Sequence, residues 1–321
     1  MNIINFKNTY CPDLWDGFTI LKNGDIYSCC LVKPQKIGNI YQSNLKKLIN
    51  NKIIKNYRAQ SLNGNLECYE KCNFVRKTNQ NFKNPHKIEI KYRELKRLHI
   101  SFSEQCNIHC IMCKHPENYQ KDKTVLDHKI LIKNIDISPF ENILIQGGEP
   151  LCIENCLKYL NYLTQMEKKY MLLTNGTLID ELMAKKLAKE AKAVVISINS
   201  ATKETHEKIN VGSKFEKVLN ALDLLRKFRQ MYKSDLVIFG RMTLTTENIK
   251  EIPLFLKKYK KLGFDFVNFG YDRDSVPQFL KFNPKLKKNL TANITRILNK
   301  SNLNNVDLQR LYQLNLVGIL N

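Results

Sequence analysis

The stretch Cys106-Asn-Ile-His-Cys110-Ile-Met-Cys113 places three thiols at C-x3-C-x2-C spacing, directly after the apolar run Leu98–Phe102. A closed structural zinc site commonly uses four protein ligands. Three cysteine thiolates can instead hold an iron–sulfur cubane and leave one iron without a protein ligand. The count of three therefore favours a cluster whose open iron binds another molecule.

Strand-like and helical runs alternate around this loop. The predicted strands are Leu98–Ser103, Asn142–Gln146, Tyr170–Thr174, Ala193–Ile198, Leu236–Thr243 and Asp265–Phe269, and the predicted helices are Glu154–Lys168, Ile179–Ala191, Lys214–Tyr232 and Glu247–Leu262. This alternation is typical of right-handed βαβ units and a parallel sheet. Six strands are too few for a closed eight-stranded barrel, so the sequence predicts an α/β fold with a partial (β/α)6 TIM-like barrel.

Polar and small residues follow the predicted strands, where parallel α/β folds form their sites. Glycines let the backbone approach a ligand closely, a carboxylate and exposed carbonyls suit an ammonium group, and hydroxyls and amides suit a ribose or a carboxylate. The candidate residues at this rim are Gly147, Gly148, Glu149, Thr174, Asn175, Ser197, Asn199 and Arg241. Each short motif alone is also compatible with an ordinary turn.

A cysteine-rich segment precedes this region. Phe18–Cys30 reads as a β-hairpin around Asn23-Gly24, the signal of a type I′ turn, and a helical stretch covers Ser43–Gln60. Four thiols could converge there: Cys11, Cys29, Cys68 and Cys72, with Cys30 as an alternative to Cys29. Spacing alone allows either tetrahedral zinc or a [4Fe-4S] cluster, and the second cysteine motif downstream favours the cluster.

The composition is that of a soluble globular protein, with 321 residues, 43% hydrophobic and 26% charged. No apolar run approaches the roughly 18 residues of a membrane helix, and the N-terminus lacks a signal-peptide pattern. We therefore expect a cytoplasmic protein with no membrane partner, whose ten cysteines serve metals more than disulfides. The net charge of +22 admits a nucleic-acid partner, but a general bias toward lysine and asparagine explains it better.

Together, the three-cysteine loop, Gly147-Gly-Glu-Pro150 and the later polar strand ends resemble the radical S-adenosylmethionine (SAM) superfamily over residues 97–275. The resemblance implies a [4Fe-4S] cluster on Cys106, Cys110 and Cys113, with SAM chelated to the open iron by its amine and carboxylate. It also implies reductive cleavage of SAM to a 5′-deoxyadenosyl radical, which abstracts a substrate hydrogen. Met112 takes the apolar place where the family packs on the adenine.

Residues 1–80 resemble the auxiliary-cluster module called SPASM, or its shorter twitch form, and the four cysteines fit the single-cluster version. The resemblance implies a second [4Fe-4S] cluster on the four converging thiols, in a module placed before the core. The predicted division is therefore 1–80 auxiliary-cluster module, 81–96 linker with an edge strand at Lys87–Tyr92, 97–275 radical SAM core and 276–321 helical extension.

The core departs from the family pattern at two positions. Asn199 stands where relatives have the Asp of Ser-x-Asp, and Asn210 stands where an Arg often follows the His206-x-x-x pattern. We therefore expect Arg241 to replace the usual anchor for the SAM carboxylate.

Peptide or protein modification is the preferred activity, with an electron donor such as flavodoxin or ferredoxin as partner. RNA, nucleotide or small-molecule modification by the same radical chemistry is the alternative, and a non-enzymatic iron–sulfur or zinc protein is the third reading.

Overall fold

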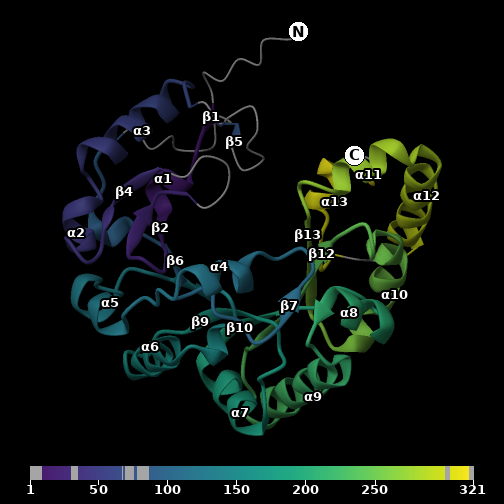
Figure 1. Ribbon diagram of the computed structural model, residues 1–321. Coiled ribbons are helices and arrows are strands. Elements are labelled where there is room, and N and C mark those ends of the chain that lie inside the picture. The colour runs from purple at the N-terminus through teal and green to yellow at the C-terminus, as the bar shows by residue number, and fades with distance from the viewer. Residues whose placement is uncertain are drawn as a thin grey trace. The chain divides into compact units, whose positions relative to one another are not determined.

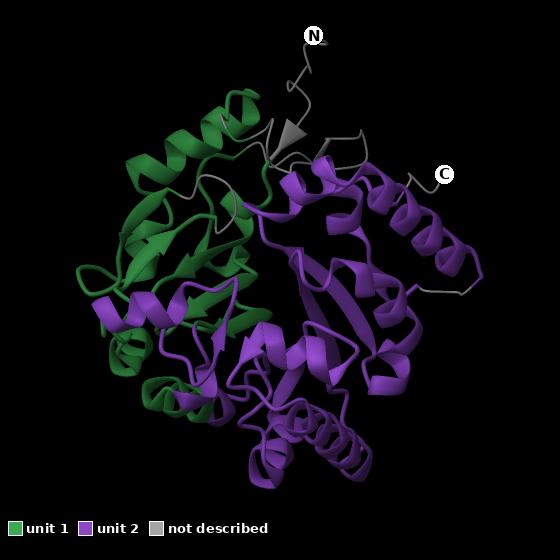
Figure 2. Cartoon of the chain, turned by 45° about the vertical axis from the view of Figure 1, so that its right-hand side comes forward, with its two compact units in different colours: residues 1–103, 123–147, 153–162 green, residues 104–122, 148–152, 163–321 purple. Residues whose placement is uncertain are grey.

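The computed structural model describes residues 9–29, 35–66, 68, 76–77, 87–300 and 304–317, and divides the chain into two compact units (Figures 1 and 2). Unit 1 comprises residues 1–103, 123–147 and 153–162, and unit 2 comprises residues 104–122, 148–152 and 163–321. Each unit gathers segments that are distant along the chain. The predicted boundaries at residues 80, 96 and 275 stay a prediction.

Unit 1 is built on a five-stranded part of a sheet with the order β4-β3-β2-β6-β8. Strands β2, β6 and β8 are parallel, and β2, β3 and β4 are antiparallel. Its elements are β1 (Thr9–Tyr10), α1 (Asp13–Asp16), β2 (Gly17–Ile20), β3 (Asp25–Tyr27), β4 (Lys36–Asn39), α2 (Leu45–Leu48), α3 (Lys52–Leu62), β5 (Arg76–Lys77), η3 (Tyr92–Glu94), β6 (Arg97–Ser101), α5 (His128–Asn134), β8 (Asn142–Gln146) and the start of α6 (Glu154–Gln165).

The predicted N-terminal hairpin is present as β2 and β3, but its turn differs from the expected type I′. Gly24 N–H donates to Leu21 at 2.8 Å and has φ +80°, while Leu21 N–H donates to the Asp25 carbonyl at 3.0 Å. A three-residue loop with one glycine at positive φ is the next most common hairpin connection. The Asn23 side chain accepts from Asp25 N–H at 3.1 Å, which stabilises this longer turn.

The hairpin extends the parallel sheet of unit 1 through strand β2. It pairs in parallel with β6, where Thr19 lies opposite His99 and Ile20 opposite Ile100. Gly17 is needed at this junction because a Cβ there would lie 2.1 Å from the Arg97 carbonyl oxygen. The sequence did not predict this pairing, since pairing of distant strands leaves no local signal.

The predicted single helix Ser43–Gln60 is two helices, because Asn51 caps α3 by accepting from Ile54 N–H.

A fully buried arginine, Arg58, connects helix α3 to other segments of unit 1. Arg58 on α3 donates from Nε to the Leu14 carbonyl at 2.8 Å and from Nη1 to the Ile88 carbonyl at 3.0 Å. Burial lowers the pKa of Arg58 to about 10. These bonds tie α1 and the segment before β6 to α3.

Replacing Arg58 by methionine is expected to lower the free energy of unfolding by about 3 kcal/mol, because the buried Leu14 carbonyl and the partly buried Ile88 carbonyl lose a charged donor. Urea unfolding followed by circular dichroism measures the change. Arg93→Met is the matched control, since Arg93 is exposed and its replacement should cost less than about 0.5 kcal/mol. Equal midpoints for the two variants would contradict this role of Arg58.

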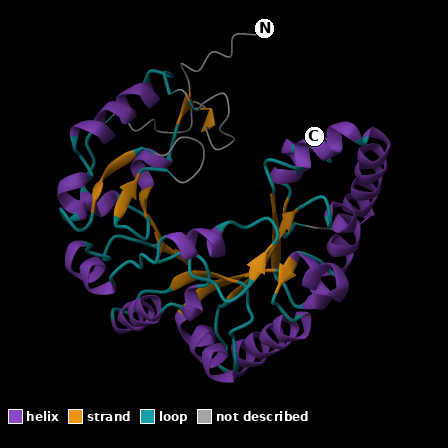
Figure 3. Cartoon of the chain, in the orientation of Figure 1, coloured by secondary structure: helices purple, strands orange, loops and turns teal. Residues whose placement is uncertain are grey.

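Unit 2 is built on the parallel strand order β9-β10-β12-β13-β14, with strands followed by helices along the chain (Figure 3). Its elements are β7 (His109–Cys110), α4 (His115–Lys121), η4 (Pro150–Cys152), β9 (Tyr170–Thr174), α7 (Glu181–Glu190), β10 (Ala191–Ser197), α8 (Lys203–Ile209), β11 (Asn210–Val211), α9 (Phe215–Met231), β12 (Val237–Leu244), η5 (Ile249–Glu251), α10 (Ile252–Leu262), β13 (Phe266–Tyr271), α11 (Val276–Phe282), α12 (Pro284–Lys300), β14 (Val306–Asp307) and α13 (Gln309–Gln313).

The six predicted core strands are confirmed as β6, β8, β9, β10, β12 and β13, with ends shifted by at most a few residues. The predicted edge strand at Lys87–Tyr92 is wrong: residues 87–91 form no strand, and η3 begins at Tyr92. The predicted helical extension 276–321 is not helical throughout, because it contains the strand β14 ahead of the short α13. Among the described helices, none is both long and apolar enough to cross a membrane.

Candidate metal centre and active site

The three-cysteine loop lies in unit 2 and is held by a short antiparallel pair. Strand β7 pairs with β11, with Cys110 opposite Asn210, and Ile111 N–H donates to the Ile209 carbonyl at 2.9 Å. Cys113 N–H donates to the Cys110 carbonyl at 2.9 Å, which closes the turn between these two cysteines. The backbone of the loop is therefore fixed by bonds that leave the thiols available.

The three thiols are close enough to influence one another. Burial raises the pKa of Cys110 to about 12, and the charges of Cys113 and Cys106 raise it further. Burial is also the main cause of the raised pKa values of Cys106 and Cys113. None of the eight cysteines in the described residues forms a disulfide.

Three cysteine thiols in one loop are a donor set that fits an iron–sulfur cubane. Among the described residues, no three His, Cys, Asp or Glu side chains converge on one metal-ion position. In a cubane each thiolate binds a different iron, so its thiols need not meet at one point. A cluster would also supply the positive charge that buried thiolates need.

Gly147 and Gly148 are required because of close backbone approaches. A Cβ at Gly148 would lie 2.0 Å from the Gln105 carbonyl oxygen, next to the first cysteine of the loop. Gly147 has φ +136°, and a Cβ there would lie 2.7 Å from the Ser103 carbonyl oxygen. The Gly-Gly pair therefore allows the chain to pass directly against the segment that leads into the cysteine loop.

Glu149 is fully buried and is the centre of a hydrogen-bond network. Its Oε1 accepts from Thr174 Oγ1 at 2.7 Å and from Leu151 N–H at 3.1 Å, and its Oε2 accepts from Asn175 N–H at 2.7 Å. Its backbone N–H donates to the Gln105 carbonyl at 2.7 Å. Burial raises the pKa of the Glu149 carboxyl, and the three accepted bonds act against this rise.

The Glu149 carboxylate is therefore engaged with the protein rather than turned toward an open face. Its contacts make it a positioning residue that joins the start of the cysteine loop to the end of β9. The sequence suggested that this carboxylate would suit an ammonium group, and a direct contact with SAM stays a prediction.

Asn175 connects this network to the cysteine loop. Its Nδ2 donates to Asn107 Oδ1 at 2.9 Å and lies 3.9 Å from the Cys106 sulfur. Asn107 Nδ2 in turn donates to Thr177 Oγ1 at 2.9 Å. The structure thus brings Cys106, Asn175, Thr174 and Glu149 together, as expected for residues that follow neighbouring predicted strands.

The two positions that depart from the family pattern face each other. Asn199 Nδ2 donates to Asn210 Oδ1 at 2.7 Å, and both residues are buried. Asn199 Oδ1 accepts from Thr243 N–H at 2.8 Å. Where the pattern has an acid and an arginine, this chain has a pair of amides, and the pair lies opposite Cys110 through strand β11.

His206 lies behind this amide pair, and its pKa reports how strongly this region is buried. Burial lowers the pKa of His206 to about 4, and the charge of Glu207 opposes the shift. The folded protein therefore keeps His206 neutral, while the unfolded chain protonates it below its ordinary pKa of about 6.5. Stability is fully present above about pH 6.5 and is lost as the pH falls toward about 4.

We expect the free energy of unfolding to fall by about 2 kcal/mol between about pH 7.5 and about pH 5 because of His206. Urea midpoints at both pH values measure it. His206→Gln, which cannot titrate there, should show a smaller pH dependence by that amount. An unchanged pH dependence in this variant would contradict the assignment.

The remaining rim candidates are spread over unit 2. Met112 is half-buried between the last two cysteines, and Ser197 is half-buried at the end of β10. Arg241 lies opposite Ser197 in the parallel register of β10 and β12. No contact joins the Arg241 side chain to the cysteine loop among the bonds of the described residues.

The auxiliary cysteines belong to unit 1 and are partly described. Cys11 is buried, and its N–H donates to Ser61 Oγ at 2.9 Å. Burial, Asp13 and the charge of Cys29 raise the pKa of Cys11, which places the Cys11 and Cys29 thiols near each other. Cys68 is half-buried, while Cys30 and Cys72 lie outside the described residues.

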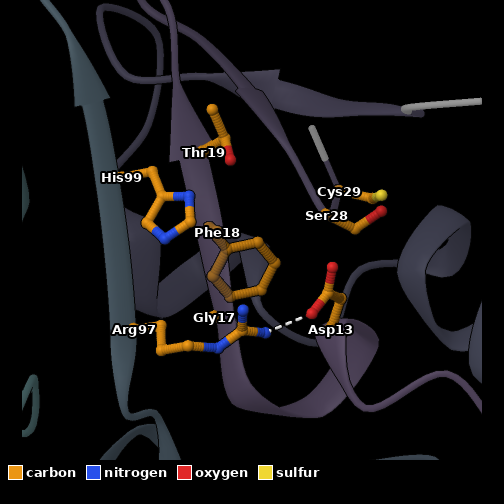
Figure 4. A pocket seen from close by; sticks show the side chains of 8 residues that line it. All are labelled: Asp13, Gly17, Phe18, Thr19, Ser28, Cys29, Arg97 and His99. Carbon is orange, nitrogen blue, oxygen red and sulfur yellow. Dashed lines mark hydrogen bonds and ion pairs between the residues drawn. The ribbon is translucent and has the colours of Figure 1, made fainter. Parts of the chain in front are cut away.

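Cys29 also borders a small pocket of unit 1 into which two side chains of β6 point (Figure 4). Arg97 forms an ion pair with Asp13 in this pocket. His99 follows two residues later on the same face of β6 and also lines the pocket. Burial lowers the pKa of His99, and the charge of Arg97 lowers it further. Neither residue was predicted as part of a site, although their alternation with buried Leu98 and Ile100 is the pattern of a half-buried strand.

Comparison with known proteins agrees with these observations. The family model described as the Radical SAM superfamily matches residues 100–259, and the model described as an iron–sulfur cluster-binding domain, SPASM, matches residues 11–73. The chain is 27% identical over 216 residues to a probable GTP 3′,8-cyclase of Methanocaldococcus jannaschii, covering 65% of this chain and 66% of the relative. It is 35% identical over 140 residues to a GTP 3′,8-cyclase of Aliarcobacter butzleri, covering 41% and 43%.

A solved structure of native anSMEcpe with bound AdoMet is similar at 24% identity, with a TM-score of 0.46 and coverage of 63% of this chain and 61% of that one. The matches span less than two thirds of the length of these curated relatives.

The two matched domains indicate which cofactors the chain binds. The radical SAM domain implies a [4Fe-4S] cluster with SAM, and the SPASM domain implies auxiliary iron–sulfur clusters. The α/β class with its partial (β/α)6 order of strands and helices is confirmed. The chain therefore belongs to the radical SAM superfamily, with an iron–sulfur cluster-binding SPASM domain on the N-terminal side of its core.

Proposed function

We propose that this chain binds a [4Fe-4S] cluster through Cys106, Cys110 and Cys113 and uses it to cleave SAM reductively. The observation that carries the proposal is the continuous hydrogen-bond network from the first of these cysteines through Asn175 to buried Glu149. When bound, the cluster supplies the electron that splits SAM into methionine and a 5′-deoxyadenosyl radical, which abstracts a hydrogen atom from the substrate.

The rim residues predicted from the sequence would bind and orient SAM at this centre. The close approach of Gly148 to Gln105 leaves no side chain between the loop and the strand ends. Glu149 fixes Thr174 and Asn175, whose polar groups suit the ribose and the carboxylate of SAM. Gly147, Ser197 and Asn199 complete the proposed binding residues, with Met112 on the adenine and Arg241 as a carboxylate anchor.

The auxiliary cluster is proposed to use Cys11, Cys29, Cys68 and Cys72, with Cys30 as the alternative to Cys29. Support comes from the electrostatic effect of Cys29 on the Cys11 thiol, whose pKa it raises. The cluster would either bind the substrate or accept an electron from it. A flavodoxin or ferredoxin is the proposed electron donor for SAM cleavage.

Modification of a peptide or protein is the proposed reaction. This choice rests on the SPASM domain, since relatives with such modules often act on peptides or proteins. A nucleotide substrate is the second candidate, because two sequence relatives are named GTP 3′,8-cyclase. The net charge of +22 is compatible with either, since an acidic peptide and a nucleotide are both anions.

Anaerobic reconstitution followed by iron and sulfide analysis tests the proposal. Two cubanes predict about eight irons per chain. Incubation with SAM and dithionite should then yield 5′-deoxyadenosine. Bound zinc without SAM cleavage would contradict an enzyme of this class.

The substrate is tested by adding GTP or a peptide pool to the reconstituted protein together with SAM and dithionite. Faster 5′-deoxyadenosine formation with GTP, together with a new nucleotide product, would favour the second candidate. A mass change in a peptide would favour the first. Steep salt dependence of binding would accompany an anionic substrate of either class.

A further inference from the structure

An arginine on the half-buried face of a strand of unit 2 has no hydrogen-bond or ion-pair partner among the described residues. Arg241 projects from β12, and its guanidinium forms no hydrogen bond or ion pair with any described residue. Its Nη2 lies 3.4 Å from the position that a Cβ of Gly270 would occupy, as does Thr243 Oγ1. The glycine of β13 thus leaves room beside the guanidinium.

A second guanidinium approaches Arg241 from the C-terminal helix. Helix α13 packs against β13 (Figure 1), and its Arg310 acts electrostatically on Arg241. Asp307 is the acidic group that acts on Arg241, but it is exposed and accepts from Gln309 N–H at 2.9 Å. Arg241 therefore has a second guanidinium acting on it, and the acid that acts on it is exposed.

Two neutral side chains add unused hydrogen-bonding capacity nearby. Gln313 accepts from Arg310 Nη1 at 2.8 Å through Oε1, while its buried Nε2 has no partner among the described residues. Asn268, opposite Arg241 in the register of β12 and β13, has a buried Oδ1 that also lacks a partner there. Its amide can present either end to a ligand.

These groups are mostly donors, so the ligand that satisfies them must be an acceptor. Unpaired buried donors are costly, and two guanidiniums near each other repel. A carboxylate or phosphate satisfies both requirements at once, because arginine matches the planar arrangement of such oxygens.

We propose that Arg241, Arg310 and Gln313, with Asn268, form an oxyanion-binding site on the β12–β13–α13 side of unit 2. The oxyanion is either the carboxylate of SAM or a carboxylate or phosphate of the substrate. Where the substrate provides it, the site selects an anionic peptide end, an acidic side chain or a phosphorylated compound. This inference rests on the proposed function only in naming SAM and its substrate.

Calorimetric titration with inorganic phosphate at constant ionic strength tests the site in the full chain. Wild-type protein should bind phosphate saturably, and Arg241→Met and Arg310→Met should each weaken binding by about tenfold or more. Arg296→Met is the matched control, because Arg296 is exposed on α12. This variant should bind phosphate with the affinity of the wild type. Urea midpoints near the wild-type value would show that the variants fold.

A second titration, with SAM on the reconstituted protein, identifies the source of the oxyanion. Phosphate binding lost in both variants with SAM affinity unchanged assigns the site to the substrate. Loss of both affinities, with phosphate competing against SAM, assigns it to the SAM carboxylate. The proposal is overturned if the wild type binds no phosphate and both variants bind SAM normally. The phosphate experiment needs neither cluster nor SAM, so its outcome is independent of whether SAM is cleaved.

Discussion

Replacing Cys106, Cys110 and Cys113 together by alanine is expected to remove about four of about eight irons per reconstituted chain and to abolish 5′-deoxyadenosine formation. All three thiols belong to one loop fixed by β7 and β11, and they influence one another electrostatically. Removing them takes away every protein ligand of the proposed SAM-binding cluster. Iron and sulfide analysis and chromatography of the nucleoside product measure the two effects.

Two further variants separate the clusters. Cys11→Ala should lose the other four irons or so while the SAM-binding cluster remains, because Cys11 lies in unit 1 beside Cys29. Cys152→Ser is the control within unit 2, since its thiol bonds to the Glu149 carbonyl at 3.1 Å and is not among the proposed ligands. A triple variant that still holds about eight irons, or still forms 5′-deoxyadenosine, would refute the ligand assignment.

The core strands could be predicted from the sequence because each is a local signal. Strand β12 alternates half-buried and buried residues over its whole length, and β8 and β9 have the predicted ends. Helix α7 begins where Asp180 accepts from Met183 N–H, which is a local cap. Short apolar runs between such caps can be recognised from the neighbouring residues alone.

Elements that depend on distant partners could not be predicted. Strand β14 has two residues, and it exists because Val306 and Asp307 pair with Val267 and Asn268. The β7–β11 pair joins residues a hundred positions apart along the chain, and neither half is long enough to give a periodic signal. The parallel pairing of β2 with β6 was missed for the same reason.

For the site, the residue types were predictable and their roles were less so. The motifs identified Glu149, Thr174 and Asn175, and the structure joins them by hydrogen bonds. The burial of Glu149 could not be read from a Gly-Gly-Glu-Pro motif, because it depends on how Gln105 and the end of β9 pack around it. Asn199 and Asn210 were identified as separate departures, whereas only the fold shows that each is the partner of the other.

Glu149→Gln is expected to lower the free energy of unfolding by about 2 kcal/mol or more and to slow 5′-deoxyadenosine formation by at least about tenfold. The buried carboxylate accepts three bonds, from Thr174 Oγ1, Leu151 N–H and Asn175 N–H. An amide offers a single acceptor oxygen, so at least one of the backbone N–H groups faces a donor in either orientation. The displaced Asn175 then no longer fixes Asn107 beside the cysteine loop.

The matched control for this change is Glu154→Gln, because Glu154 is an exposed glutamate whose ion pair with Lys158 is of the weak i,i+4 kind. Its stability and its rate of SAM cleavage should stay within error of the wild type. Urea unfolding, SAM titration and nucleoside analysis are carried out on both variants after equal reconstitution, so that a loss of activity is not a loss of iron. A Glu149→Gln variant with wild-type stability and rate would show that the network does not position the site. Retained iron with weakened SAM binding is the result expected if Glu149 acts by holding Thr174 and Asn175 in place.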